Sequence, residues 1–155
     1  MSAERFRVIA RVIILTPDRR VVLVTSRTGK ALVLPGGTVD TGESLPHAAI
    51  REAKEECGVD VVIGQAIWLR EFVEPRGQAS LEVYFLGRPA QGTALPDRWE
   101  HVDEANPQIT RKAGLYSRDD FKTIDLPIFP DELREAFWMG LDKGYAEAYL
   151  GRFKA

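Results

Sequence analysis

The chain has 155 residues, of which 45% are hydrophobic and 28% charged, and its 23 acidic and 21 basic side chains give a net charge of -2 at pH 7. This length predicts one globular domain over residues 1–155. The near balance of charge excludes a protein that mainly grips a nucleic acid backbone, because such binding needs a basic surface. No apolar run approaches the roughly 20 residues that span a bilayer, so we expect no membrane partner.

The chain has a single cysteine, Cys57, so no disulfide can form within it. Residues 1–7 interleave charged and apolar side chains and lack the apolar block of a signal peptide. Both features favour a reducing, cytoplasmic location.

Short segments rich in Val and Ile alternate with turns at the start of the chain. They predict strands over residues 6–16, 21–25 and 31–34, separated by turn-forming residues. Residues 35–43 contain three glycines and follow neither a helical nor a strand period. This segment is therefore predicted to be a loop.

A helix is predicted to begin after Ser44, a suitable N-cap, and to end at Cys57, before Gly58. Its apolar stripe consists of Ala49, Ile50, Ala53 and Cys57. Three glutamates, Glu52, Glu55 and Glu56, fall on a separate sector, because spacings of three and four bring residues together on a helix.

The remainder of the chain predicts strands over 59–63, 66–73 and 81–86, and then a long loop over 89–109 that contains three prolines. A second helix is predicted from Pro130 through Leu141, with the tail 145–155 extending it beyond Gly144. Together these elements predict an α/β fold in which helices pack on the faces of a mixed sheet.

The three clustered glutamates indicate a cation site. Like charges at helical spacing destabilise a helix by roughly 0.2–0.5 kcal/mol per pair, and the helix dipole also disfavours acids near the C-terminus. A solvated acidic face is the alternative interpretation. Mg²⁺ prefers oxygen ligands and commonly bridges carboxylates to substrate phosphates, so the pattern points to metal-assisted hydrolysis of a phosphate compound.

The spacing of these residues resembles a complete Nudix box. Gly37 is followed after five residues by Glu43 and after seven more by the segment 51–59, Arg-Glu-Ala-Lys-Glu-Glu-Cys-Gly-Val. Ala53 is the one mild departure, since the family more often has a larger aliphatic residue there. The resemblance covers residues 37–59 and implies a Nudix-type α/β/α sandwich with a mixed β-sheet between helices.

The resemblance also implies an enzyme, a pyrophosphohydrolase that uses Mg²⁺ or Mn²⁺. Its substrate would be a nucleoside diphosphate linked to another moiety, such as ADP-ribose, a nucleotide sugar or a nucleoside triphosphate. The matching metal-binding positions are Gly37, Glu52, Glu55 and Glu56. Glu43 and Arg51 match the pair that braces the loop against the helix, so Arg51 supports catalysis through geometry. The general base is left open, with Glu55 or Glu52 as the candidates within the box.

Residues outside the box offer further candidates. An external base could be any of Glu71, Glu74, Glu82, Asp103 and Glu104. Trp99, in the predicted loop, is the better candidate for stacking a nucleobase, whereas Trp68 is interpreted as core, and Glu104 is a second substrate-binding candidate. Pro75 stands 16 residues beyond Val59, as in the ADP-ribose branch of the family, although Pro75 to Gln78 is also an ordinary turn.

Two other classes of function remain open at this point. A Nudix-like domain can bind a nucleotide or RNA as a regulator without hydrolysing it, and such domains often lack the acids that this chain retains. A scaffold without any ligand would leave the clustered glutamates unexplained. The expected partner is a small nucleotide, and the resemblance leaves a homodimer open.

Overall fold

The computed structural model describes residues 6–154. The strands are β1 (Arg7–Ile14), β2 (Arg20–Thr25), β3 (Leu32–Val33), β4 (Gly36–Thr38), β5 (Val61–Val73), β6 (Ala79–Pro89), β7 (Arg98–Val102), β8 (Thr110–Ser117), β9 (Ile128–Phe129) and β10 (Tyr149–Lys154). The α-helices are α1 (Leu45–Cys57) and α2 (Ala136–Lys143), and short 3₁₀ turns cover Asp120–Lys122 and Asp131–Leu133. Within these residues, no helix is long and apolar enough to cross a membrane.

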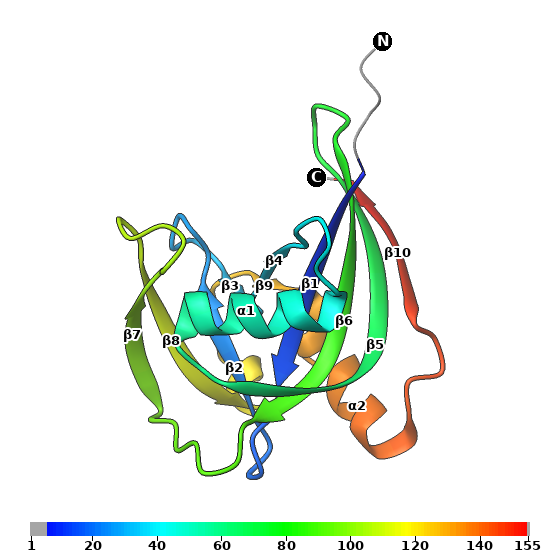
Figure 1. The fold of residues 1–155 in the computed structure, drawn as a ribbon. Helices are drawn as coiled ribbons and strands as arrows, with labels where there is room; N and C mark the ends of the chain where they lie inside the picture. Colours follow the sequence, from blue (N-terminus) through cyan, green and yellow to red (C-terminus); the bar gives the residue numbers. More distant parts are fainter. Residues whose placement is uncertain (1–5, 155) are drawn as a thin grey trace.

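The strands form two five-stranded mixed sheets. The first has the order β10-β5-β6-β1-β4, and the second has the order β7-β8-β2-β3-β9. In the first sheet β1 pairs in parallel with β6 and antiparallel with β4, which places Ala10 opposite Gly37. Figure 1 shows α1 crossing in front of the strands and α2 lying apart from it at the lower right.

Alternation along the strands divides the core into two clusters, because successive side chains point to opposite faces of a sheet. Val12 and Val22 belong to the cluster beneath α1, together with Ala49 and Ala53 of that helix. Their neighbours Ile13, Val21 and Leu23 belong to a second cluster, which includes Phe137 and Trp138 of α2. The predicted α/β fold, with mixed β-structure between helices, is thereby confirmed.

In the middle of the chain the structure corrects two predictions of secondary structure. The predicted loop over 89–109 contains β7, whose side chains alternate between half-buried and exposed positions. The segments predicted at 59–63 and 66–73 are joined into one long strand, β5, with register shifts between Ile63 and Trp68. The bulge bends the strand without ending it, which a sequence pattern of two short strands does not reveal.

The C-terminal region also differs from its prediction. Residues 131–133 form a 3₁₀ turn, and α2 begins only at Ala136. The tail is not helical: β10 pairs in parallel with β5. Gly140 lies inside α2, and a Cβ there would lie 2.0 Å from the Tyr145 ring, so glycine lets this ring pack against the helix.

Candidate active site

Helix α1 is fixed at both ends by named contacts. At its start the Ser44 hydroxyl accepts a hydrogen bond from the His47 N–H, at 3.3 Å. At its end Gly58 adopts a left-handed conformation, with φ 72°, and its N–H donates to Lys54 O. The predicted cap and stop of this helix are confirmed, and the helix therefore holds its glutamates in a defined place.

The β7 strand and the loop after it donate hydrogen bonds to carbonyl groups at the end of α1. The Trp99 indole N–H donates to Cys57 O at 2.9 Å, and the Glu104 N–H donates to Glu55 O at 3.0 Å. The last carbonyls of a helix have no partner within it, so such contacts stabilise its end. Trp99 and Glu104 thus act on the helix, and neither is among the residues that line the acidic cleft described below.

Arg51 is the centre of the brace between loop and helix. Its guanidinium donates to both carboxylate oxygens of Glu43, at 2.7 and 3.0 Å, and to Thr38 O at 3.2 Å. It also contacts Glu52 at 3.0 Å and Glu55 at 3.2 Å. The Arg51 hydrogen bonds lower the pKa of the Glu43 carboxyl to about 2. The geometry agrees with the bracing role expected for this pair.

Gly37 lies directly against Glu52. A Cβ at Gly37 would be 2.5 Å from Glu52 Oε1, so the Glu52 carboxylate would have to move aside for any larger residue. The antiparallel pairing of β4 with β1 holds this glycine in place. Glycine therefore lets the loop backbone approach the carboxylate in its present position.

The three glutamates of the box have different environments. Glu56 is buried, with 7% of its surface exposed, whereas the Glu52 and Glu55 side chains are 14% and 22% exposed. Burial raises the pKa of the Glu56 carboxyl to about 8, opposed by the Arg111 charge and reinforced by Glu52. Burial and the Glu52 charge also raise the pKa of Glu55. A buried carboxyl that lacks a cationic partner is a suitable ligand for a cation.

An acidic cleft of about 430 Å³ opens above these groups, and Gly37, Glu52 and Glu56 line it. Arg11 and Arg111 line the same cleft from β1 and β8. Sequence reasoning missed these two arginines, because they lie far from the box and belong to no motif. Only their position in the two sheets brings them to the site.

The external base candidates are held in other contacts. Glu71 accepts a hydrogen bond from the Tyr149 hydroxyl, and Glu74 pairs with Arg7. Glu82 accepts a hydrogen bond from the Arg11 Nε at 2.9 Å and lines the neighbouring apolar cavity rather than the cleft. Of the five, Asp103 alone lines the cleft, and it forms a buried ion pair with Arg111 at 3.0 Å.

The acidic side chains of the cleft fit a metal ion by their chemistry but are not gathered around one point. Across residues 6–154, no group of three or more His, Cys, Asp and Glu side chains is gathered closely enough to hold a metal as it stands. In this structure Arg51 forms ion pairs with Glu52 and Glu55. The chemistry of the donors nevertheless fits a hard divalent cation, since the Glu56 carboxyl is buried and has a raised pKa beside a second carboxylate.

A second, mostly apolar cavity of about 590 Å³ adjoins the acidic cleft, and Arg11 and Val33 line both. Its walls include the rings of Phe72, Phe129 and Phe153. The Arg11 side chain is held at the junction by Glu82 and by Leu34 O, at 2.9 and 3.1 Å. The two cavities therefore meet at Arg11 and Val33.

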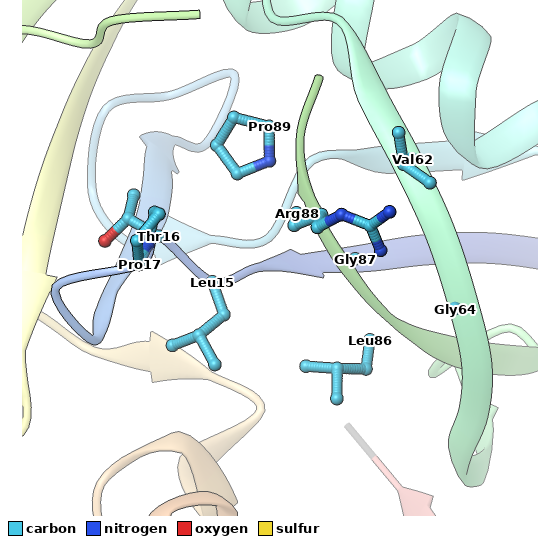
Figure 2. Close-up of a pocket in the computed structure, with 9 residues that line it drawn as sticks. All are labelled: Leu15, Thr16, Pro17, Val62, Gly64, Leu86, Gly87, Arg88 and Pro89. Atoms are coloured by element: carbon cyan, nitrogen blue, oxygen red, sulfur yellow. The ribbon is translucent and has the colours of Figure 1, made fainter. Parts of the chain in front are cut away.

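Figure 2 shows a separate pocket of about 340 Å³ near the turn between β1 and β2. Leu15, Leu86 and Val62 contribute apolar side chains to it, and Arg88 is its charged member. None of the residues that line the acidic cleft also lines this pocket. None of its lining residues is an acid, so this pocket offers no carboxylate ligand for a divalent cation.

A family model described as the NUDIX domain matches residues 5–121. This match covers most of the chain, and the protein belongs to the NUDIX domain family. The loop, helix and acidic cleft described above all lie within the matched part.

Particular relatives were found by sequence and by structure. A Bacillus subtilis (strain 168) protein named "Putative 8-oxo-dGTP diphosphatase" is 34% identical over 91 residues, which are 59% of this chain and 59% of that protein. A NUDIX hydrolase from Nitrosomonas europaea has a TM-score of 0.68 at 19% identity, covering 99% of this chain and 82% of that one. An ADP-ribose pyrophosphatase from Streptococcus suis 89-1591 has a TM-score of 0.59 at 24% identity, covering 96% and 99%. Both structures share the fold.

Proposed function

We propose that this protein hydrolyses the pyrophosphate linkage of a nucleoside diphosphate joined to another moiety, in a reaction that depends on Mg²⁺ or Mn²⁺. The observation that carries the proposal is Glu56, a buried carboxyl beside Glu52 in a cleft whose loop approaches through Gly37. A divalent cation there would neutralise phosphate charge and ease deprotonation of the attacking water. We place this activity in the cytoplasm, where the buried Cys57 thiol stays reduced.

The chain's own residues have distinct parts in this reaction. Glu52, Glu56 and the Gly37 carbonyl would hold the cation, and Arg51 fixes the loop against the helix. Water oxygen forms a bond to one phosphorus, the bridging P–O bond breaks, and a carboxylate accepts the proton of the water. Glu52 lines the cleft and Glu55 does not, which favours Glu52 as this base.

The adjoining apolar cavity supplies the place for the nucleoside. Phe72, Tyr84, Phe129 and Phe153 give it aromatic walls that suit a flat nucleobase. Arg11 lies between this cavity and the acids, where it can contact the phosphates. ADP-ribose, nucleotide sugars and nucleoside triphosphates all carry a nucleoside joined to a pyrophosphate linkage, and they differ in the group beyond that linkage. The Bacillus subtilis relative is named for a substrate of the last kind.

Hydrolysis of these three substrate types, with Mg²⁺, Mn²⁺ or chelator, tests the proposal. We expect the E56Q variant to lose at least about a hundredfold in kcat/KM, because it lacks the ligating carboxylate. Its stability should be close to that of the native protein, since a carboxyl with a pKa of about 8 is mostly uncharged at pH 7 without metal.

The E100Q variant is the matched control, because Glu100 is exposed on β7 and lies outside the cleft. It should retain full activity. Binding of nucleotide without product in the native protein would indicate a regulator and contradict the proposed hydrolysis. Full activity of E56Q would show that the metal site is wrong.

A further inference from the structure

Charged side chains of both signs line the acidic cleft. They are four arginines and four acids, namely Arg11, Arg27, Arg51, Arg111, Asp40, Glu52, Glu56 and Asp103. Such a site selects its ligand by the charges that remain after the internal pairs have formed. The pairs therefore decide which groups are available to a substrate.

Three of the arginines are committed to carboxylates of the protein. Arg51 pairs with Glu43 and Glu52, and Arg111 pairs with Asp103. Arg11 pairs with Glu82, which lies in the apolar cavity. Within residues 6–154, the exposed Arg27 side chain forms no ion pair, and Glu56 forms none either. Among the described residues, Arg27 is thus the one arginine of this cleft that no carboxylate of the protein pairs.

The backbone that carries Arg27 is held firmly. The Arg111 guanidinium donates to Thr25 O at 2.9 Å, and the Lys112 N–H donates to the Thr25 hydroxyl at 3.0 Å. The Ser26 N–H donates to Ala31 O at 2.9 Å and closes the turn between β2 and β3. Arg27 is therefore presented at the cleft from a fixed position, while its side chain is free to meet a ligand.

We propose that Arg27 binds the terminal phosphate of a nucleoside triphosphate whose reacting anhydride lies against Glu52 and Glu56. The inference rests on the proposed hydrolysis and narrows it to one substrate class. A metal-chelated polyphosphate can bring its cation to Glu52 and Glu56 and its terminal phosphate to the unpaired Arg27 guanidinium. In a nucleotide sugar the group beyond the anhydride is a neutral sugar, which would leave the guanidinium without an ionic partner.

Equilibrium binding tests this assignment separately from hydrolysis. The probes are methylene-bridged, non-hydrolysable analogues of one nucleoside triphosphate and its diphosphate, titrated calorimetrically with Mg²⁺ present. We expect R27Q to weaken triphosphate binding about tenfold and diphosphate binding less than about twofold. R27K should retain most of the affinity, because it keeps the positive charge. R76Q, at an exposed arginine in the turn between β5 and β6, is the matched control and should bind both analogues normally.

Kinetics give a second readout. R27Q should raise KM for the triphosphate and leave kcat nearly unchanged, as expected when a substrate contact is lost equally from ground state and transition state. Equal loss of affinity for both analogues, or no loss, would overturn the role of Arg27. The native protein could instead hydrolyse a nucleotide sugar efficiently and no triphosphate, with R27Q leaving that rate unchanged. This result would overturn the present inference while sustaining the proposed hydrolysis. Triphosphate binding that depends on Arg27, without any turnover, would support the role of Arg27 and overturn the proposed hydrolysis.

Discussion

Gly37 shows how narrowly a single residue determines the geometry of the site. Its Cα has space for hydrogen only, because a Cβ would lie 2.5 Å from Glu52 Oε1 and 2.6 Å from the Glu52 carboxyl carbon. The contact involves the reactive end of a proposed metal ligand. A change at this position therefore affects catalysis more directly than it affects the core.

We expect G37A to displace the Glu52 carboxylate and to reduce kcat/KM at least about tenfold. Because the clashing atoms are the movable end of the Glu52 side chain, the free energy of unfolding should fall by only about 1 kcal/mol, measured by urea denaturation. In the E52A background the clash is absent, so adding G37A should cost much less stability. Equal costs in the two backgrounds would mean that Glu52 is not what excludes the side chain.

At the scale of elements, α1 depends on segments that lie on either side of it in the sequence. The glycine loop reaches it through the Glu43–Arg51 brace, and the β7 region reaches its last carbonyls through Trp99 and Glu104. The brace is ionic, whereas the contacts at the helix end are hydrogen bonds to backbone. Only the ionic brace should weaken as the pH falls into the acid range.

The acid dependence of stability provides a test of the brace. The pKa of Glu43 is about 2 in the folded protein, below its ordinary value of 4.5. Its stabilising contribution is therefore complete above about pH 4.5 and is lost as pH falls toward 2. We expect urea denaturation to show a shallower loss of stability between pH 5 and pH 2.5 for E43Q than for the native protein. E100Q should follow the native slope, and identical slopes for all three would argue against the brace.

The sequence was most informative where local rules determine structure. Ser44 and Gly58 mark the ends of α1, and the glutamate spacing predicts the acidic sector that the cleft exposes. The sequence was least informative where distant segments pair: β7 adds to β8, and β10 adds to β5, through contacts that no local pattern contains. Trp99 is the type of residue that often contacts a ligand, yet its indole N–H donates to the Cys57 carbonyl at the end of α1.

At the scale of the whole molecule, the last part of the chain completes the binding region. Phe129 and Pro130 form one wall of the apolar cavity, and Phe153 of β10 forms another. The Phe153 ring stacks on Phe72, with centroids 5.4 Å apart and planes 20° from parallel. The cavity proposed to hold the nucleoside is thus assembled from segments about 80 residues apart.

We expect F153A to raise KM for the nucleotide severalfold while kcat changes little, because the ring lies away from the reacting anhydride. Phe153 is 46% exposed, so its truncation should lower stability by only about 1 kcal/mol. M139A is the matched control, since Met139 is 45% exposed on α2 and outside both cavities. Equal KM values for the two variants would place the nucleoside elsewhere.

The family match ends at residue 121, whereas Phe129, Pro130 and Phe153 lie beyond it. The apolar cavity is therefore built from both stretches, with Phe72 and Tyr84 inside the matched part and these three residues outside it. If this cavity holds the nucleoside, as proposed, substitutions in the final 34 residues can reshape one side of it without touching the box.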